Sequence, residues 1–78
     1  MAAWNPDQVL DARGLSCPMP ILKTKKIMKE MQTGQILEIK STDPGTANDL
    51  PSFLARSGDQ LLDSQESQGF VSYYVQKA

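Results

Sequence analysis

Two prolines separated by a single residue, Pro18 and Pro20, constrain this 78-residue chain more than any other feature. Neither has a backbone N–H, so neither can join the hydrogen-bond ladder of a central strand, but the fixed φ of proline suits the first turn of a helix. The alternating apolar and polar residues at 8–13 predict a strand just before them. The sequence therefore predicts a strand-to-helix connection that holds the only cysteine, Cys17, at the N-cap of a helix starting at Pro18.

Six elements are predicted in all, in the order β-α-β-α-β-β. Alternating or β-branched stretches indicate strands, and apolar residues three and four positions apart indicate the core face of the first helix, which Gly34 closes in the C′ position. The order predicts one α/β domain over residues 1–78, a two-layer α/β sandwich with two helices on one face of a four-stranded mixed sheet. The predicted strands cover residues 8–13, 35–41, 61–67 and 70–76.

The second helical segment is the least regular part of this pattern. Asp43 is expected to be its N-cap. A proline within a helix collides with the carbonyl four residues earlier, so Pro51 is expected to interrupt the helix. We therefore expect an irregular turn over 45–49, followed by a short helix over 51–57 that ends at Gly58.

Composition excludes several classes of function. With no histidine and one cysteine, the chain cannot form a zinc finger, a Cys–His nucleophile pair or a C-x-x-C redox pair. A net charge of −1 and a pI of about 5.1 give no sign of nucleic acid or an anionic membrane as a partner. The N-terminal residues do not resemble a secretory signal, and no apolar run approaches the about 20 residues that span a bilayer, so we expect a cytoplasmic location.

Thiol chemistry in this chain depends on Cys17 alone. At a helix N-terminus the macrodipole favours a thiolate by about 0.3–1 kcal/mol. Because Pro18 and Pro20 have no amide hydrogen, we expect only the Met19 amide to face the sulfur. The prolines would hold the sulfur outward, rigid and mildly acidified, which suits a group carrier better than a self-contained enzyme. The alternative is that Cys17 is a small buried residue that closes the helix start.

The residues after Cys17 suggest a docking surface. Met19 and Leu22 fall on the polar side of the helical wheel, where exposed apolar side chains mark a contact surface; alternatively, Leu22 packs against the second helix. Lys25 and Lys26 belong to a lysine-rich helix face. They would either steer an acidic partner towards the sulfur or simply be solvated.

The residues before Cys17 are expected to shape its loop. Gly14 is expected to supply a positive φ in the turn that aims the cysteine. Asp11 is expected to bond to the backbone of that turn, a structural role. For Arg13 two positions remain open, beside the sulfur or in solvent.

The motif L-D-A-R-G-L-S-C-P-M-P at 10–20, followed by K-T-K-K at 23–26, resembles the signature of the TusA-like (SirA-type) sulfur-carrier proteins. That signature is an L-D-x-x-G-L-x-C-P-x-P run at the first helix. The stretches D-P-G-T at 43–46, D-L-P at 49–51 and G-D-Q-L-L at 58–62 fit the same family. The resemblance spans nearly the whole chain and implies the sandwich fold predicted above. At one position, Met19, many family members carry glutamate instead.

The resemblance implies that Cys17 carries sulfur as a covalent persulfide, without a separate cofactor. The donor would be a cysteine desulfurase or a rhodanese-like protein, and the acceptor a DsrE-like protein with a reactive cysteine. Downstream pathways in the family include tRNA thiolation, sulfur oxidation and cofactor biosynthesis. The carrier is expected to be a monomer when free.

Two other functions remain open at this stage. A small regulatory or protein-binding module with a structural cysteine would need no reactive thiol. A nucleic-acid-binding domain is suggested by fold analogy alone, and the acidic pI argues against it.

Overall fold

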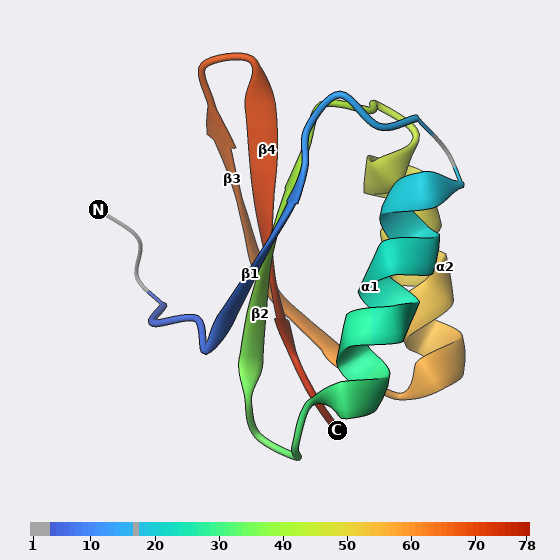
Figure 1. Ribbon diagram of the computed structural model, residues 1–78, viewed down its shortest axis with the longest axis vertical. Helices are drawn as coiled ribbons and strands as arrows, with labels where there is room; N and C mark the ends of the chain where they lie inside the picture. The colour runs from blue at the N-terminus through green and yellow to red at the C-terminus, as the bar shows by residue number, and fades with distance from the viewer. Residues whose placement is uncertain (1–3, 17) are drawn as a thin grey trace.

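The computed structural model describes residues 4–16 and 18–78. Its elements follow the predicted order: β1 (Gln8–Ala12), α1 (Met19–Glu30), β2 (Ile36–Ser41), α2 (Thr46–Ser57), β3 (Gln60–Ser67) and β4 (Phe70–Gln76). Both helices cover the same face of one sheet, and the N-terminal segment lies on the opposite side (Figure 1). The predicted two-layer sandwich is confirmed.

The sheet has the strand order β1-β2-β4-β3, in which β1 and β2 are parallel and the other two pairs are antiparallel. In this register Leu10 lies beside Ile39, which lies beside Tyr73, and all three are buried on the helix-facing side. Because β1 and β2 run in parallel, the connections from these strands to α1 and α2 both start at the carboxyl ends of the strands, on the same end of the sheet. The fold therefore brings the two strand-to-helix connections together.

The first helix has the predicted core face but different ends. Thr24 and Met28 are buried, and truncating a side chain such as Met28 to alanine costs about 2–5 kcal/mol. The N-cap of α1 is Pro18, one position later than expected. Its C-cap, Met31, has an extended backbone and is buried in the core, so the predicted glycine C′ is wrong. Gly34 takes a φ of +89° in the turn that leads into β2 instead.

The second helix is longer than predicted, because it continues through Pro51. Its N-cap is Gly45 rather than Asp43, and its first amides donate to carbonyls three residues earlier, as in a 3₁₀ turn. Ala47, whose carbonyl would have received the missing Pro51 amide, is exposed, so water can solvate that carbonyl. The prediction that α2 ends at Gly58 is confirmed, since Gly58 adopts the left-handed conformation with a φ of 87°.

The N-terminal segment is tied to the sheet by polar contacts. The backbone N–H of Asp7 donates to the Ile36 carbonyl at 2.7 Å, and the Asp7 carboxylate accepts from the Ile36 amide at 2.8 Å. The Trp4 indole N–H donates to the Asp63 carboxylate at 3.3 Å, which links this segment to β3. Among the described residues, no helix is long and apolar enough to cross a bilayer.

Candidate functional site

The candidate site is the connection between β1 and α1. Cys17 itself lies outside the described residues, but the prediction that makes it the N-cap of α1 is wrong, because that position is held by Pro18. Its neighbours on either side, Ser16 and Pro18, are both exposed. The connection leaves the carboxyl end of β1, where two parallel strands end side by side, which is a common place for binding and chemistry in α/β folds.

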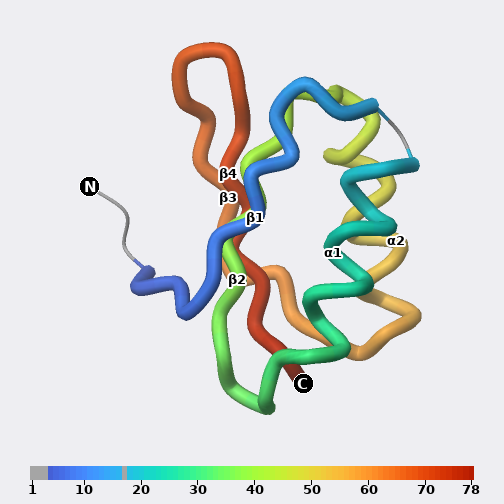
Figure 2. Tube along the Cα trace, viewed as in Figure 1, coloured from blue at the N-terminus to red at the C-terminus, as the bar shows by residue number. Residues whose placement is uncertain are grey.

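A tight turn starts this connection. The Leu15 amide donates to the Ala12 carbonyl at 3.2 Å, and Gly14 has a φ of +83°, the conformation that a type II turn requires at its third residue. The prediction of a positive φ at Gly14 is confirmed. The Gly14 amide donates to the Thr42 hydroxyl at 2.9 Å, so the turn is attached to the connection after β2. The two connections run next to each other in the Cα trace (Figure 2).

Asp11 and Arg13 form an ion pair beside this turn. The Arg13 side chain donates to both carboxylate oxygens of Asp11 at 2.8 Å, and the Arg13 backbone amide also donates to that carboxylate. These bonds lower the pKa of Asp11 to about 2 and raise the pKa of Arg13. Asp11 thus bonds to the backbone of the turn, as predicted. The structure also gives the position of Arg13, whose guanidinium lies 5.1 Å from the centre of the Phe70 ring.

The start of α1 differs from the prediction in its hydrogen bonds. The Met19 amide, expected to face the sulfur of Cys17, donates to the Ser16 carbonyl at 2.9 Å. The Leu22 amide donates to the Pro18 carbonyl at 3.0 Å and begins the helical ladder. None of the backbone amides at residues 18–20 is therefore available to the sulfur, since Pro18 and Pro20 have no amide hydrogen and the Met19 amide is bonded to Ser16. The Met19 side chain is 41% exposed.

Leu22 lies at the edge of a groove between the two helices. This inter-helix groove has a volume of about 450 Å³ and is lined by Ile21, Leu22, Lys25, Phe53, Arg56 and Ser57. Leu22 remains 51% exposed, so it contributes to the groove wall without being covered by α2. Of the two expectations for Leu22, the exposed position is confirmed.

The lysines of α1 are exposed along its outer face. Lys25 borders the inter-helix groove, and Lys26 lies on the solvent side of the helix. Within the part of the chain that the structure describes, no lysine of α1 has an ion-pair partner. An unpaired cationic face is compatible with either of its expected roles, steering or solvation.

Sequence reasoning missed several residues that surround this site. Thr42 holds the turn at Gly14, Phe70 contacts Arg13, and Phe53 and Arg56 complete the inter-helix groove. Thr42 and Phe70 are distant along the chain and carry no local motif, so only the sheet topology reveals them. Phe53 and Arg56 could have been found from their three-residue spacing on the predicted second helix.

Comparison with known proteins agrees with this geometry. Residues 8–77 match the family model described as sulfurtransferase TusA. The chain is 46% identical over 71 residues to the putative sulfur carrier protein YrkI of Bacillus subtilis, covering 91% of this chain and 95% of that protein. It is 42% identical over 72 residues to the sulfur carrier protein TusA of Allochromatium vinosum, with 92% and 95% covered.

A solved structure shares the fold. The crystal structure of the SirA-like protein from Desulfitobacterium hafniense superimposes with a TM-score of 0.79 at 20% identity, covering 88% of this chain and 95% of that one. With the family model and the two sulfur-carrier relatives spanning nearly the whole sequence, the chain belongs to the TusA family of sulfur carriers.

Proposed function

We propose that this protein carries sulfur as a persulfide on Cys17, between a donor and an acceptor protein. The observation that carries this proposal is the setting of the cysteine. It is the only one in the chain, it falls between the exposed residues Ser16 and Pro18, and it immediately precedes the N-cap of α1. We therefore expect its thiol to be accessible to another protein's active site.

The chemistry is an exchange between disulfide-like bonds. In loading, the Cys17 thiolate attacks the outer sulfur of a persulfide on the donor; a new S–S bond forms, the donor's S–S bond breaks, and the donor cysteine leaves as a thiolate. In unloading, the acceptor's thiolate attacks the same outer sulfur and Cys17 leaves. Each step forms one S–S bond and breaks another, so neither an oxidant nor a reductant is consumed.

The residues around Cys17 support a carrier rather than a self-contained enzyme. The chain has no histidine to act as a base. Arg13 is engaged by Asp11, and the Met19 amide is engaged by Ser16, so neither group is directed at stabilising charge elsewhere. Catalysis of each transfer would therefore come from the partner proteins.

The partners follow from the chemistry and from the family. The donor is a cysteine desulfurase or a rhodanese-like protein, and the acceptor is a DsrE-like protein with a reactive cysteine, acting in the cytoplasm. The inter-helix groove is the docking surface, because Ile21, Leu22 and Phe53 offer apolar contact while Lys25 and Arg56 supply positive charge at its sides. A partner segment with an apolar residue flanked by carboxylates would fit it.

Sulfur loading tests the proposal directly. We would incubate the protein with a cysteine desulfurase and free cysteine, then measure the intact mass. The expected result is the gain of one sulfur atom, its loss on adding a thiol reductant, and its transfer to a DsrE-like acceptor.

Cys17→Ser is the matched control, and its loading is expected to be abolished. Its melting temperature should stay close to that of the unchanged protein, because surface substitutions usually change stability by about 0.5 kcal/mol or less. If Cys17→Ser still gains sulfur, or fails to fold, the carrier proposal is wrong. If the unchanged protein never loads although its thiol is open to alkylation, a binding module with an idle cysteine becomes the better function.

A further inference from the structure

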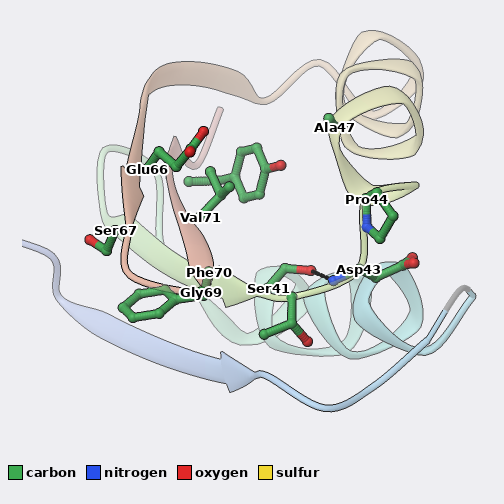
Figure 3. A pocket seen from close by; sticks show the side chains of 11 residues that line it. Ser41, Asp43, Pro44, Ala47, Glu66, Ser67, Gly69, Phe70 and Val71 are labelled. Atoms are coloured by element: carbon green, nitrogen blue, oxygen red, sulfur yellow. Dashed lines mark hydrogen bonds between the residues drawn. The ribbon is translucent and has the colours of Figure 1, made fainter.

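A second cavity lies beside the candidate site, on the other side of the connection after β2. It has a volume of about 380 Å³ and lies between residues 41–44, the exposed Ala47 at the start of α2, and the β3–β4 hairpin. Figure 3 shows Glu66 and Val71 on the side of the hairpin that faces Pro44 and Ala47. We refer to this space as the hairpin cavity.

Tyr73 gives the cavity an unusual polar group. Its side chain is 5% exposed, yet within the described residues its hydroxyl has no hydrogen-bond partner. Every fully buried side-chain nitrogen or oxygen among these residues does have a partner, so the Tyr73 oxygen must reach solvent. The hairpin cavity, which Tyr73 lines, is where it does so. A buried ring that holds an uncommitted hydroxyl at a cavity is positioned to bond to an incoming group.

The charge around this hydroxyl is negative. In the hairpin, Glu66 is paired with Val71 and Ser64 is paired with Tyr73. Glu66 and Tyr73 are therefore diagonal neighbours on one face of the sheet, with their Cα atoms about 7 Å apart. The nearby Asp43 adds to the effect of burial in raising the pKa of Tyr73. Among the described residues that line the cavity, none is a lysine or an arginine.

An anion is a poor fit for the same space. The start of α2 borders the cavity, and helix N-termini often bind anions through free amides. Here the amides of Thr46, Ala47 and Asn48 donate to the carbonyls of residues 43–45. Two cations, Arg13 and Lys40, lie against the Phe70 ring, at 5.1 and 6.0 Å from its centre, and do not line the cavity.

The cavity is connected to the loop of Cys17. Thr42 lines it and also accepts the Gly14 amide at 2.9 Å. A protein that exchanges sulfur with Cys17 would therefore approach the loop that Thr42 links to this cavity. We propose that the hairpin cavity binds a lysine or arginine side chain of that protein, with Glu66 as the charge partner and the Tyr73 hydroxyl as a hydrogen-bond acceptor. The identity of the occupant as part of a sulfur-exchange partner rests on the proposed function.

The first test needs no partner. N-acetyl-arginine methylamide would be titrated into ¹⁵N-labelled protein, with the citrulline analogue as the neutral control of the same shape. The amide signals of residues 67, 69, 71 and 73 should shift with arginine and not with citrulline. Glu66→Gln should weaken this binding about tenfold, the effect of one charge-assisted hydrogen bond. Tyr73→Phe should weaken it while leaving stability unchanged, since the lost hydroxyl has no partner in the described fold.

Glu30→Gln is the matched control, because Glu30 is an exposed carboxylate at the far end of α1. It should bind the arginine probe as the unchanged protein does. Equal shifts with citrulline, or binding that survives Glu66→Gln, would overturn the cavity proposal. So would shifts that map outside the hairpin.

The second test separates this inference from the carrier function. Sulfur transfer to a DsrE-like acceptor would be followed with the unchanged protein, Glu66→Gln and Glu30→Gln. Transfer by Glu66→Gln should require a higher acceptor concentration, with loading of Cys17 intact. If Cys17 never loads, the carrier function fails while the arginine titration still stands. If all three proteins transfer sulfur equally, the cavity is not a partner site although the carrier function stands.

Discussion

The two strand-to-helix connections of this protein differ in the burial and the hydrogen bonding of their residues. After β2, the Ser41 hydroxyl is 2.9 Å from that of Thr46 and accepts the Asp43 amide, and Thr46 is only 1% exposed. After β1, the described residues on both sides of Cys17 are exposed, and the N-cap of α1 makes no side-chain capping bond. The turn there relies on its neighbour through Thr42.

This difference shows how one connection of a small fold can hold the turn of another in place. The connection after β2 is held at both ends by the buried hydroxyls of Ser41 and Thr46, so it can support its neighbour. The connection after β1 takes its position from that support and from the Asp11–Arg13 pair. The turn at Gly14 is thus held in part by a residue of another connection.

The largest expected effect comes from breaking the buried connection. Thr46→Val removes one hydroxyl of a buried pair and should destabilise the protein by about 1–3 kcal/mol. Thr42→Val, the same change in an exposed side chain, should cost about 0.5 kcal/mol or less because water can replace its bond to Gly14. Urea denaturation of both variants would measure their free energies of unfolding. Equal losses would show that the two connections do not differ in the way described.

A second, somewhat smaller effect concerns the surface beside the open connection. Lys25→Glu with Lys26→Glu should slow association with a partner about tenfold at low salt, and less at high salt, because steering is screened within about 10 Å at 0.1 M. Leu22→Ala should instead speed dissociation with little dependence on salt. Stopped-flow binding at two salt concentrations distinguishes the slower association of the lysine variant from the faster dissociation of Leu22→Ala.

Lys29→Glu, in the last turn of α1, is the matched control for these variants and should have the smaller effect on association. None of the changes should alter the reaction of Cys17 with a small alkylating agent. Unchanged binding by all of the groove variants would place the docking surface elsewhere.

A third prediction concerns the field around the cysteine. Met19→Glu, at an exposed position two residues after Cys17, should raise the pKa of the thiol, since a nearby carboxylate disfavours the thiolate by about 1 kcal/mol. Alkylation near neutral pH should become slower, with little change in stability. The rate measured across a pH series gives the thiol pKa, and an unchanged value would mean that residue 19 is directed away from the sulfur.

The smallest effect should come from Asp11. Its pKa of about 2 in the folded protein lies below the ordinary value of 3.8, so its ion pair contributes stability above pH 3.8 that is lost as the pH falls through 2. Because Asp11 is exposed, solvent screens most of this contribution. Asp11→Asn should therefore unfold slightly more easily at pH 5 and match the unchanged protein near pH 2. A carboxyl NMR titration that gave a midpoint near 4 would contradict the pairing.

Much of this fold could be predicted because its signals are local. The alternation in residues 36–41 indicates directly which side chains face the core, and the strands at 36–41 and 70–76 lie where the sequence placed them. Pro51 was misjudged because the cost of a proline depends on whether the carbonyl four residues earlier is solvated, and that depends on the exposure of Ala47 in the folded protein.

The candidate site was only partly predictable, for a related reason. Its central cysteine and the turn at Gly14 belong to one continuous motif, which the sequence displays. Thr42 and Phe70 reach the turn only because β1, β2 and β4 are neighbours in the sheet. No pattern within residues 10–20 could have revealed these contacts. The Met19 amide was misassigned for a local reason, because it donates to the Ser16 carbonyl three residues earlier.

The contact between Trp4 and Asp63 gives the molecule a built-in optical probe. Trp4 is the single tryptophan of the chain, and its indole bonds to β3, across the sheet from both helices. Its fluorescence should therefore report the loss of the native sheet and be insensitive to events at the start of α1. Loading of Cys17 and unfolding of the domain could then be recorded in the same cuvette as two separate signals, absorbance for the sulfur and emission for the fold.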